Sequence, residues 1–317
     1  MTERDASSAA PRRVLLRRGG DDGIALMDVP LTVEGAWPRR ISAAGDIDGD
    51  GFGDLLGIDP PDDGKPGRAV VYFGNAEGLH PVPSALSLGE ADLAAVSIST
   101  RGDLDGDGLP DMLVGEPTRG GGAGAASAWI NGGACGEGTL RPLAATTSSG
   151  ASLGASVAAT GDFDADGYVD PVVGAPFSVL SNDQSLLWLY RGAVSAATAP
   201  TSLAFPSAQR EGFTLGAGGD VDGDGYGDLV VWMHNLQRGP MMFVFRGGAE
   251  GLARTATTIL PQQYGSTETA ISFRSVGDTD RDGRDDLIVM LSPGHVVLAR
   301  GTPEGVTVGP LPAMTLP

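Results

Sequence analysis

The stretch DVDGDGYGD, from Asp220 to Asp228, decides the fold, because it recurs along the chain at nearly constant spacing. The shared pattern is D-x-D-x-D-G-x-x-D, and consecutive copies start 57 to 59 residues apart. A period this long, met five times, predicts tandem structural units rather than one site in a unique domain. The copies are DIDGDGFGD (Asp46–Asp54), DLDGDGLPD (Asp103–Asp111), DFDADGYVD (Asp162–Asp170), DVDGDGYGD (Asp220–Asp228) and DTDRDGRDD (Asp278–Asp286).

The residues around each acidic loop follow one order of signals. A short alternating segment comes before the loop, as in ASVAAT (155–160), and an apolar run such as DLVVW (228–232) comes directly after it. The unit then continues with a turn rich in Gly and Pro and a second apolar segment, such as MFVFRG (242–247). It ends with a segment whose strand pattern is weaker. Four short strands per unit, repeated at constant period, predict an all-β fold, a β-propeller of four-stranded antiparallel blades.

Composition supports this fold and narrows the function. The 317 residues include 50 Gly and 22 Pro, which disfavour helices strongly. The net charge of −19 would repel phosphate backbones, so we expect no nucleic-acid partner. No run of about 20 apolar residues that could span a membrane is present, and the N-terminal stretch lacks the apolar region of a secretory signal.

The repeats resemble the FG-GAP family, whose units build the β-propeller of integrin α-chains. The resemblance is carried by the five acidic loops, by Leu153–Ala158 before the third loop and by Gly174-Ala175-Pro176 after it. It implies a single propeller over residues 12–317, after a disordered tail at residues 1–11. We expect five complete repeats, at residues 36–92, 93–149, 150–209, 210–267 and 268–317, plus an N-terminal half-blade at residues 12–35.

The acidic loops predict a metal site in each repeat. Carboxylates fall at positions one, three, five and nine, glycine at position six permits a sharp turn, and the seventh residue can offer its backbone carbonyl. An oxygen-only cage of this kind suits Ca²⁺ better than Mg²⁺ or Zn²⁺, so we expect about five calcium ions. The candidate ligands are Asp46, Asp48, Asp50, Phe52 and Asp54; Asp103, Asp105, Asp107, Leu109 and Asp111; Asp162, Asp164, Asp166, Tyr168 and Asp170; Asp220, Asp222, Asp224, Tyr226 and Asp228; and Asp278, Asp280, Asp282, Arg284 and Asp286.

Other features of the sequence suggest less chemistry. The tripeptide Arg101-Gly102-Asp103 overlaps the second loop, and we interpret it as a coincidence. Trp129, Trp188 and Phe243 share one phase of the repeat, which favours packing between blades over a carbohydrate platform. The three His residues and Cys135 form no catalytic set with recurring partners, so we expect no catalytic residues and no enzyme.

The leading hypothesis is a non-catalytic, calcium-stabilised propeller that recognises a protein or glycan ligand as an adhesion module. A lectin with pockets between blades, and a hydrolase or lyase on a propeller scaffold, are the alternatives, because one fold carries many functions. The incomplete N-terminal blade also suggests self-association. Calcium sites of low affinity fill only at millimolar calcium, so we expect an extracellular or cell-surface location.

Overall fold

The fold consists almost entirely of short antiparallel strands, as the sequence predicts. In the computed structural model, the residues described are those of four short N-terminal strands and of residues 38–60, 67–88, 93, 95–133, 137–145, 150–159, 161–177, 184–192, 200–206, 212–233, 241–259, 270–291 and 295–308. The predicted tail at residues 1–11, Trp37, Cys135 and His234 lie outside the described residues. The one described helix, α1 (Arg119–Gly122), has four residues, and no described helix is long and apolar enough to cross a membrane.

Five four-stranded antiparallel sheets follow one another along the chain, one for each acidic loop. Each sheet contains its strands in sequence order, apart from a short extra hairpin, β8 (Gly74–Asn75) with β9 (Gly78–Leu79), in the first. This confirms the predicted β-propeller architecture of four-stranded blades. The sheets are β5 (Arg40–Gly45), β6 (Asp54–Asp59), β7 (Arg68–Tyr72), β10 (Ser84–Leu86); β11 (Ser97–Gly102), β12 (Asp111–Glu116), β13 (Ala125–Asn131), β14 (Gly138–Pro142); β15 (Ser156–Ala158), β16 (Val172–Ala175), β17 (Gln184–Leu189), β18 (Thr201–Pro206); β19 (Phe213–Gly219), β20 (Asp228–Met233), β21 (Met241–Phe245), β22 (Thr257–Ile259); and β23 (Ala270–Gly277), β24 (Asp286–Leu291), β25 (His295–Thr302), β26 (Gly305–Val308).

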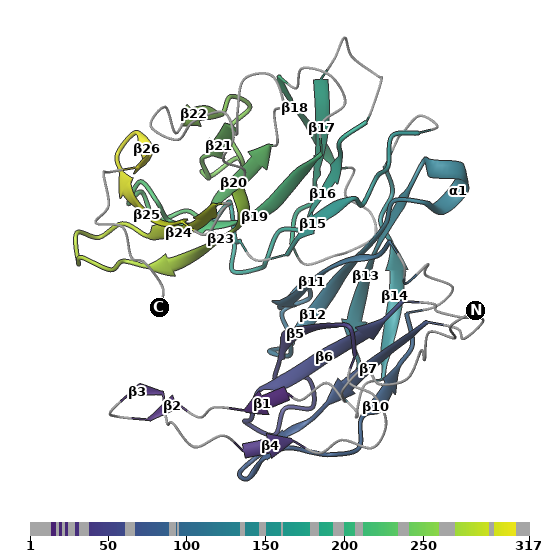
Figure 1. Cartoon of the computed structure of the whole chain (residues 1–317). Coiled ribbons are helices and arrows are strands. Elements are labelled where there is room, and N and C mark those ends of the chain that lie inside the picture. The colour runs from purple at the N-terminus through teal and green to yellow at the C-terminus, as the bar shows by residue number, and fades with distance from the viewer. Residues whose placement is uncertain are drawn as a thin grey trace, which may run out of the picture.

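The predicted half-blade contains two paired strands, β1 (Val14–Leu16) and β4 (Val29–Leu31), in antiparallel register. Between them, β2 (Gly19–Gly20) pairs with β3 (Gly23–Ile24). In the described part of the chain these strands form sheets of their own and are not hydrogen-bonded into a four-stranded sheet. Figure 1 shows them at the end of the molecule that carries the first sheet.

The hydrophobic core lies between consecutive sheets, because alternate residues of each strand point to opposite faces. In β20, Leu229 belongs to a cluster shared with the third sheet, whereas Val230 belongs to a cluster shared with the fifth. Figure 1 shows the resulting arc of five sheets, and the fifth does not return to the first.

The fifth sheet therefore has one uncovered face. Ile288 and Met290 on β24 are 37% and 41% exposed, whereas Val230 and Trp232, their equivalents on β20, are 0% and 2% exposed. The difference arises because the fifth sheet covers the fourth, while no described sheet covers the fifth.

Candidate metal centres

Each acidic loop connects the first strand of its sheet to the second, so the five loops occupy equivalent places in the fold. Adjacent loops also contact each other along the arc. The amide at position eight of one loop donates to the carbonyl at position one of the loop before it: Val169 to Asp103 at 3.3 Å, Gly227 to Asp162 at 3.0 Å and Asp285 to Asp220 at 2.8 Å. Loops two to five are thus connected in a row, whereas Pro110, at position eight of the second loop, has no amide hydrogen to donate to the first.

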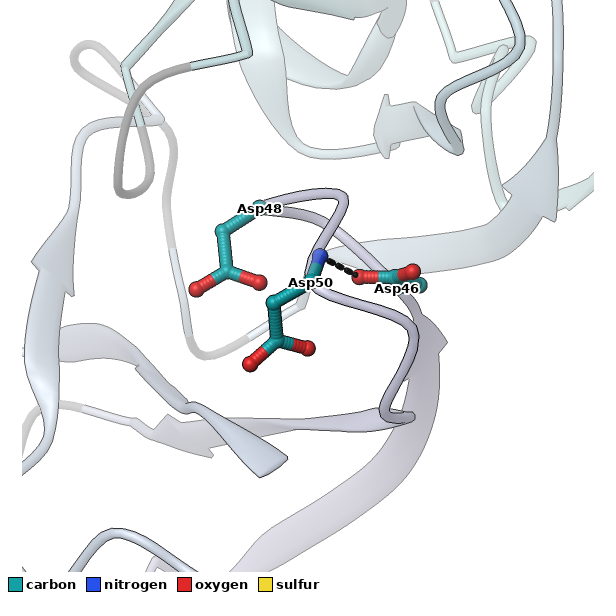
Figure 2. Close-up of side chains that lie close together, drawn as sticks. All are labelled: Asp46, Asp48 and Asp50. Atoms are coloured by element: carbon teal, nitrogen blue, oxygen red, sulfur yellow. Dashed lines mark hydrogen bonds between the residues drawn. The ribbon is translucent and has the colours of Figure 1, made fainter. Parts of the chain in front are cut away.

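The turn itself is held by the aspartates at positions one and five. In the first loop, Asp46 accepts hydrogen bonds from the amides of Asp50 at 3.0 Å and Gly51 at 2.8 Å, and Asp50 accepts one from the amide of Phe52 at 2.8 Å. Figure 2 shows the first of these bonds and the carboxylates of Asp48 and Asp50 on the same side of the turn. The same bonds from positions six and seven recur in the other four loops.

Two positions of each loop adopt left-handed backbone. Position six is glycine in every loop and has φ between 87° and 94°, which confirms the sharp turn expected there. Position four is also left-handed, and there two loops have a side chain: Ala165 at φ 57° and Arg281 at φ 63°. Such a conformation costs a residue with a Cβ about 1–2 kcal/mol. In the other three loops position four is glycine, so the left-handed backbone there could have been predicted from the sequence, but it was not.

The aspartate at position nine forms the floor of each loop. Asp228 is fully buried, and its two carboxylate oxygens accept hydrogen bonds from the amides of Val221 at 2.9 Å and Gly247 at 2.9 Å. One donor follows the first aspartate of the loop and the other follows the third strand, so the carboxylate ties three segments together. Asp54, Asp111, Asp170 and Asp286 make the same pair of bonds.

Position three differs from the other acidic positions because one of its carboxylate oxygens lacks a donor in the first three loops. One buried oxygen of Asp48, of Asp105 and of Asp164 has no hydrogen-bond donor. A buried carboxylate oxygen without a donor is unfavourable in an ion-free protein. These oxygens are therefore the observation in this structure that fits a cation.

Burial and mutual repulsion raise the pKa of several loop carboxyls. Desolvation, which outweighs the two amide donors, raises the pKa of Asp111 to about 6 and those of Asp170 and Asp228 to about 7. At position three, desolvation and the neighbouring aspartates raise the pKa of Asp164 and Asp222. Ionising these desolvated and closely spaced carboxyls is unfavourable, and the positive charge of a bound cation would offset that energy.

Arginine side chains divide the loops into two groups. The last three sheets carry Arg191, Arg246 and Arg300 directly before the residue whose amide caps the floor aspartate. Arg191 and Arg246 each lie 3.2 Å from the position-three carboxylate, that of Asp164 and of Asp222 respectively, and Arg300 pairs with Asp280.

The first two sheets have Phe73 and Ile130 at the position of these arginines. No described basic residue forms an ion pair with Asp48 or Asp105.

The fifth loop has a second arginine partner besides Arg300. Within the loop itself, Arg284 donates a hydrogen bond to Asp282 at 2.6 Å. Sequence reasoning recognised Arg281 and Arg284 as features of the fifth loop but missed the recurring arginine after the third strand, although RG at 191–192, 246–247 and 300–301 repeats visibly.

Three carboxylates of each loop offer oxygens within 4.8 Å of one another. The structure groups Asp46 with Asp48 and Asp50; Asp103 with Asp105 and Asp111; Asp162 with Asp164 and Asp170; Asp220 with Asp222 and Asp228; and Asp278 with Asp280 and Asp282. All donors are carboxylate oxygens, which hard divalent cations prefer. The position-seven carbonyls of Phe52, Leu109, Tyr168, Tyr226 and Arg284 remain predicted ligands.

The large aromatic side chains lie mainly in the core. Trp129 is 1% exposed and packs between the first and second sheets, and Phe243 is 2% exposed and packs between the third and fourth. Trp188 is partly buried against the cluster between the second and third sheets. A sugar ring could not stack on the buried face of Trp129.

Stretches of the sequence that contain these loops are similar to a known family. Two stretches match the family described as FG-GAP-like repeat, residues 103–173 and residues 220–289. Each stretch begins at one acidic loop and ends in the strand that follows the next acidic loop. The chain therefore contains FG-GAP-like repeats. The resemblance seen in the acidic loops is thereby confirmed.

Three integrin α-chains are among the relatives of this FG-GAP-like repeat protein. Integrin alpha-PS5 of Drosophila melanogaster is 32% identical over 41% of this chain and 14% of its own, and integrin alpha-7 of Homo sapiens is 30% identical over 51% and 14%. Integrin alpha-V of Gallus gallus is 31% identical over 59% of this chain and 19% of its own. The FG-GAP-like chain therefore spans less than a fifth of the length of these relatives.

A solved structure also aligns with most of the FG-GAP-like chain. A chain in the crystal structure of BBS1N in complex with ARL6DN, soaked with lead, covers 89% of this chain with a TM-score of 0.42 and 12% identity. Similarity at that level fixes neither the number of blades nor a ligand.

Proposed function

We propose that the protein is a calcium-stabilised, non-catalytic propeller that serves as an integrin-like recognition module. The observation that carries the proposal is the position-three carboxylate, which in the first three loops has a buried oxygen without a donor. A cation beside the position-three carboxylate, which we call the rim of the loop, would supply the missing partner. It would also neutralise three carboxylates whose oxygens lie within 4.8 Å of one another.

Calcium is the cation that the donor set favours. The clusters contain aspartate alone, without His or Cys, and an all-oxygen cage of flexible geometry suits calcium better than zinc or magnesium. The residues that would hold it are the aspartates at positions one, three, five and nine, together with the carbonyl at position seven. Bound calcium would join the first strand of a sheet to the second through the loop.

Native mass spectrometry with and without calcium tests this proposal. We expect about five ions per chain and a folded protein that loses them on chelation. Asp105→Asn should lower the count by one, whereas Glu304→Gln, which changes an exposed carboxylate outside the loops, should leave it unchanged. Identical masses in calcium and in chelator would overturn the proposal.

The recognition role rests on the family resemblance and on the repeated sheet scaffold. The chain spans less than a fifth of the length of the three integrin relatives. We therefore propose, rather than transfer from them, a cell-surface location and self-association through the N-terminal strand pair.

We further propose that the ligand is a protein. Pull-down of ligands in calcium against chelator tests this, and turnover on a panel of glycan or ester substrates would contradict a non-catalytic role.

A carbohydrate ligand is the second candidate, and Trp188 is the residue that supports it. Its indole is only partly buried, in contrast to that of Trp129. A glycan array compared between the natural protein and Trp188→Ala distinguishes the two candidates. Binding of a glycan that disappears in this variant would favour the lectin.

A further inference from the structure

A pocket of about 520 Å³ lies where the third sheet meets the loop between β21 and β22 of the fourth. Leu189 and Leu252, each 6% exposed, contribute apolar surface to its lining. The charged residues that line it are Arg191, Glu250 and Arg254. Its size falls within the roughly 300–1,000 Å³ of pockets that take small molecules or side chains.

The charge of this pocket is opposite to that of the protein. The chain carries a net charge of −19, whereas the pocket is lined by two arginines and one glutamate. An arginine pair beside apolar surface recognises a carboxylate on an apolar stem, because guanidinium groups form strong, directional bonds to carboxylates.

Arg191 belongs to the pocket and to the third acidic loop at once. Its Nη1 lies 3.2 Å from Oδ2 of Asp164, whose side chain is only 3% exposed, while the arginine side chain is 50% exposed. The other carboxylate oxygen of Asp164 has no donor. Without a cation, Arg191 is therefore the one positively charged partner that this buried carboxylate has in the described part of the chain.

We propose that this pocket binds a carboxylate on an apolar stem, as carried by an acidic or C-terminal segment of a protein partner, and that calcium in the third loop strengthens the binding. The second half of this inference rests on the proposed function. A calcium ion that shares the carboxylate of Asp164 would compete with Arg191 for it, and the positive charge of the ion would repel the guanidinium. Arg191 would then be available to a ligand in the pocket.

The coupling must act in both directions, because binding free energies are linked. A carboxylate that draws Arg191 away leaves Asp164 with more negative charge to offer the ion. The ligand should therefore raise the calcium affinity of the third loop by the same factor by which calcium raises the affinity for the ligand.

The fourth loop provides a matched control for this pair. Arg246 lies 3.2 Å from Asp222, just as Arg191 does from Asp164, yet Arg246 is not among the residues that line the pocket. Replacing Arg246 removes the arginine partner of the fourth loop and leaves the pocket lining intact. Replacing Arg254 changes the pocket lining and leaves the arginine–aspartate pairs of the loops intact.

The experiment titrates the whole chain with the dipeptide N-acetyl-leucyl-glutamate and, in parallel, with its uncharged diamide. Binding is followed by chemical-shift changes in ¹⁵N-labelled protein, once in millimolar calcium and once after passage over chelating resin, since EDTA itself carries carboxylates. We expect the dipeptide to bind and the uncharged diamide not to bind. The dissociation constant of the dipeptide should be at least about fivefold lower in calcium, which is the lower end of typical couplings. Arg191→Gln should abolish this calcium gain, Arg254→Gln should weaken binding in both buffers, and Arg246→Gln should change neither.

Equal binding of dipeptide and diamide, or equal effects of Arg191→Gln and Arg246→Gln, would overturn the pocket assignment. Binding of the dipeptide with the same affinity in both buffers, while mass spectrometry shows the third loop filled, would overturn the coupling alone. If no calcium binds at all, the proposed function and the coupling both fail, and binding that depends on Arg254 still supports the pocket.

Discussion

The floor and the rim of each loop use the same side chain in different ways. At the floor, Asp228 is buried and accepts two backbone hydrogen bonds of 2.9 Å, which the fold supplies by itself. At the rim, Asp48 and Asp105 keep a buried oxygen that the fold leaves without a donor. The fold alone thus completes the floor, whereas in the first three loops the rim is complete only with an ion.

The rim also varies along the row, while the floor does not. All five floor aspartates accept amides from position two and from the end of the third strand. Arginine compensates the rim in the last three loops, and in the first two the equivalent residues are Phe73 and Ile130. Stability should therefore depend on calcium through the rim, whereas the backbone hydrogen bonds of the floor should contribute with or without calcium.

Removal of all calcium should give the largest effect. Sites with dissociation constants of about 10⁻⁴ to 10⁻³ M contribute roughly 0.6–1.8 kcal/mol each at about 2 mM calcium, or on the order of 3–9 kcal/mol for five. Whole domains have only about 5–15 kcal/mol of stability. Calorimetry should show the melting temperature falling by many degrees in chelator, and superimposable transitions would contradict a structural role of the rim.

Loss of a floor aspartate should destabilise the protein with or without calcium. Asp228→Ala leaves the buried amide of Val221 and the part-buried amide of Gly247 without their acceptor, at a cost of about 1–3 kcal/mol for the first and less for the second. Urea unfolding should report a loss in chelator and a loss larger by the roughly 0.6–1.8 kcal/mol of one site in calcium, because Asp228 is also a proposed ligand. Asp228→Asn should be less affected because one oxygen remains. A loss seen in calcium only would assign Asp228 to the rim instead.

Much of this arrangement could be predicted from sequence, because loop spacing, strand order and acidic positions all repeat with the same period. The second role of the position-nine aspartate could not, because one of its donors, such as Gly192 for Asp170, lies beyond the third strand of the sheet, 22 residues away. Position three was predicted as a ligand like the others, and only the three-dimensional structure reveals that its oxygen lacks a donor. The exposure of Ile288 likewise depends on what lies beside the fifth sheet.

The pH dependence should reverse between the calcium-free and calcium-loaded protein. Folding raises the pKa of Asp170 and Asp228 from 3.8 to about 7, so these groups stabilise the calcium-free fold fully below pH 4 and lose that contribution as the pH rises through 7. Calcium requires the ionised carboxylates, so its stabilisation should grow over the same window. Melting curves from pH 5 to 8 should fall with pH in chelator and fall less, or rise, in calcium; parallel curves would contradict this.

Loss of one rim aspartate should matter only when calcium is present. Asp105→Ala removes from the second loop a ligand whose carboxylate has a buried oxygen without a donor. It should cost the roughly 0.6–1.8 kcal/mol of a single site in calcium, with little change in chelator. Two control variants outside the cages, Glu304→Ala and Arg101→Ala, should change neither stability nor metal content. Equal losses for Asp105→Ala in both buffers would show that the rim serves the fold directly.

The smallest effects should come from position four, where strain and rim charge can be separated. Ala165 and Arg281 both occupy left-handed backbone, where glycine removes about 1–2 kcal/mol of strain but gives back about 0.4–1 kcal/mol through the freer unfolded chain. Ala165→Gly should therefore stabilise the protein slightly, by about the same amount in calcium and in chelator. Arg281→Gly also removes a positive charge from the fifth loop, so its gain should be larger in calcium. If the two variants gain equally in both buffers, charge at the rim does not control calcium binding in the fifth loop.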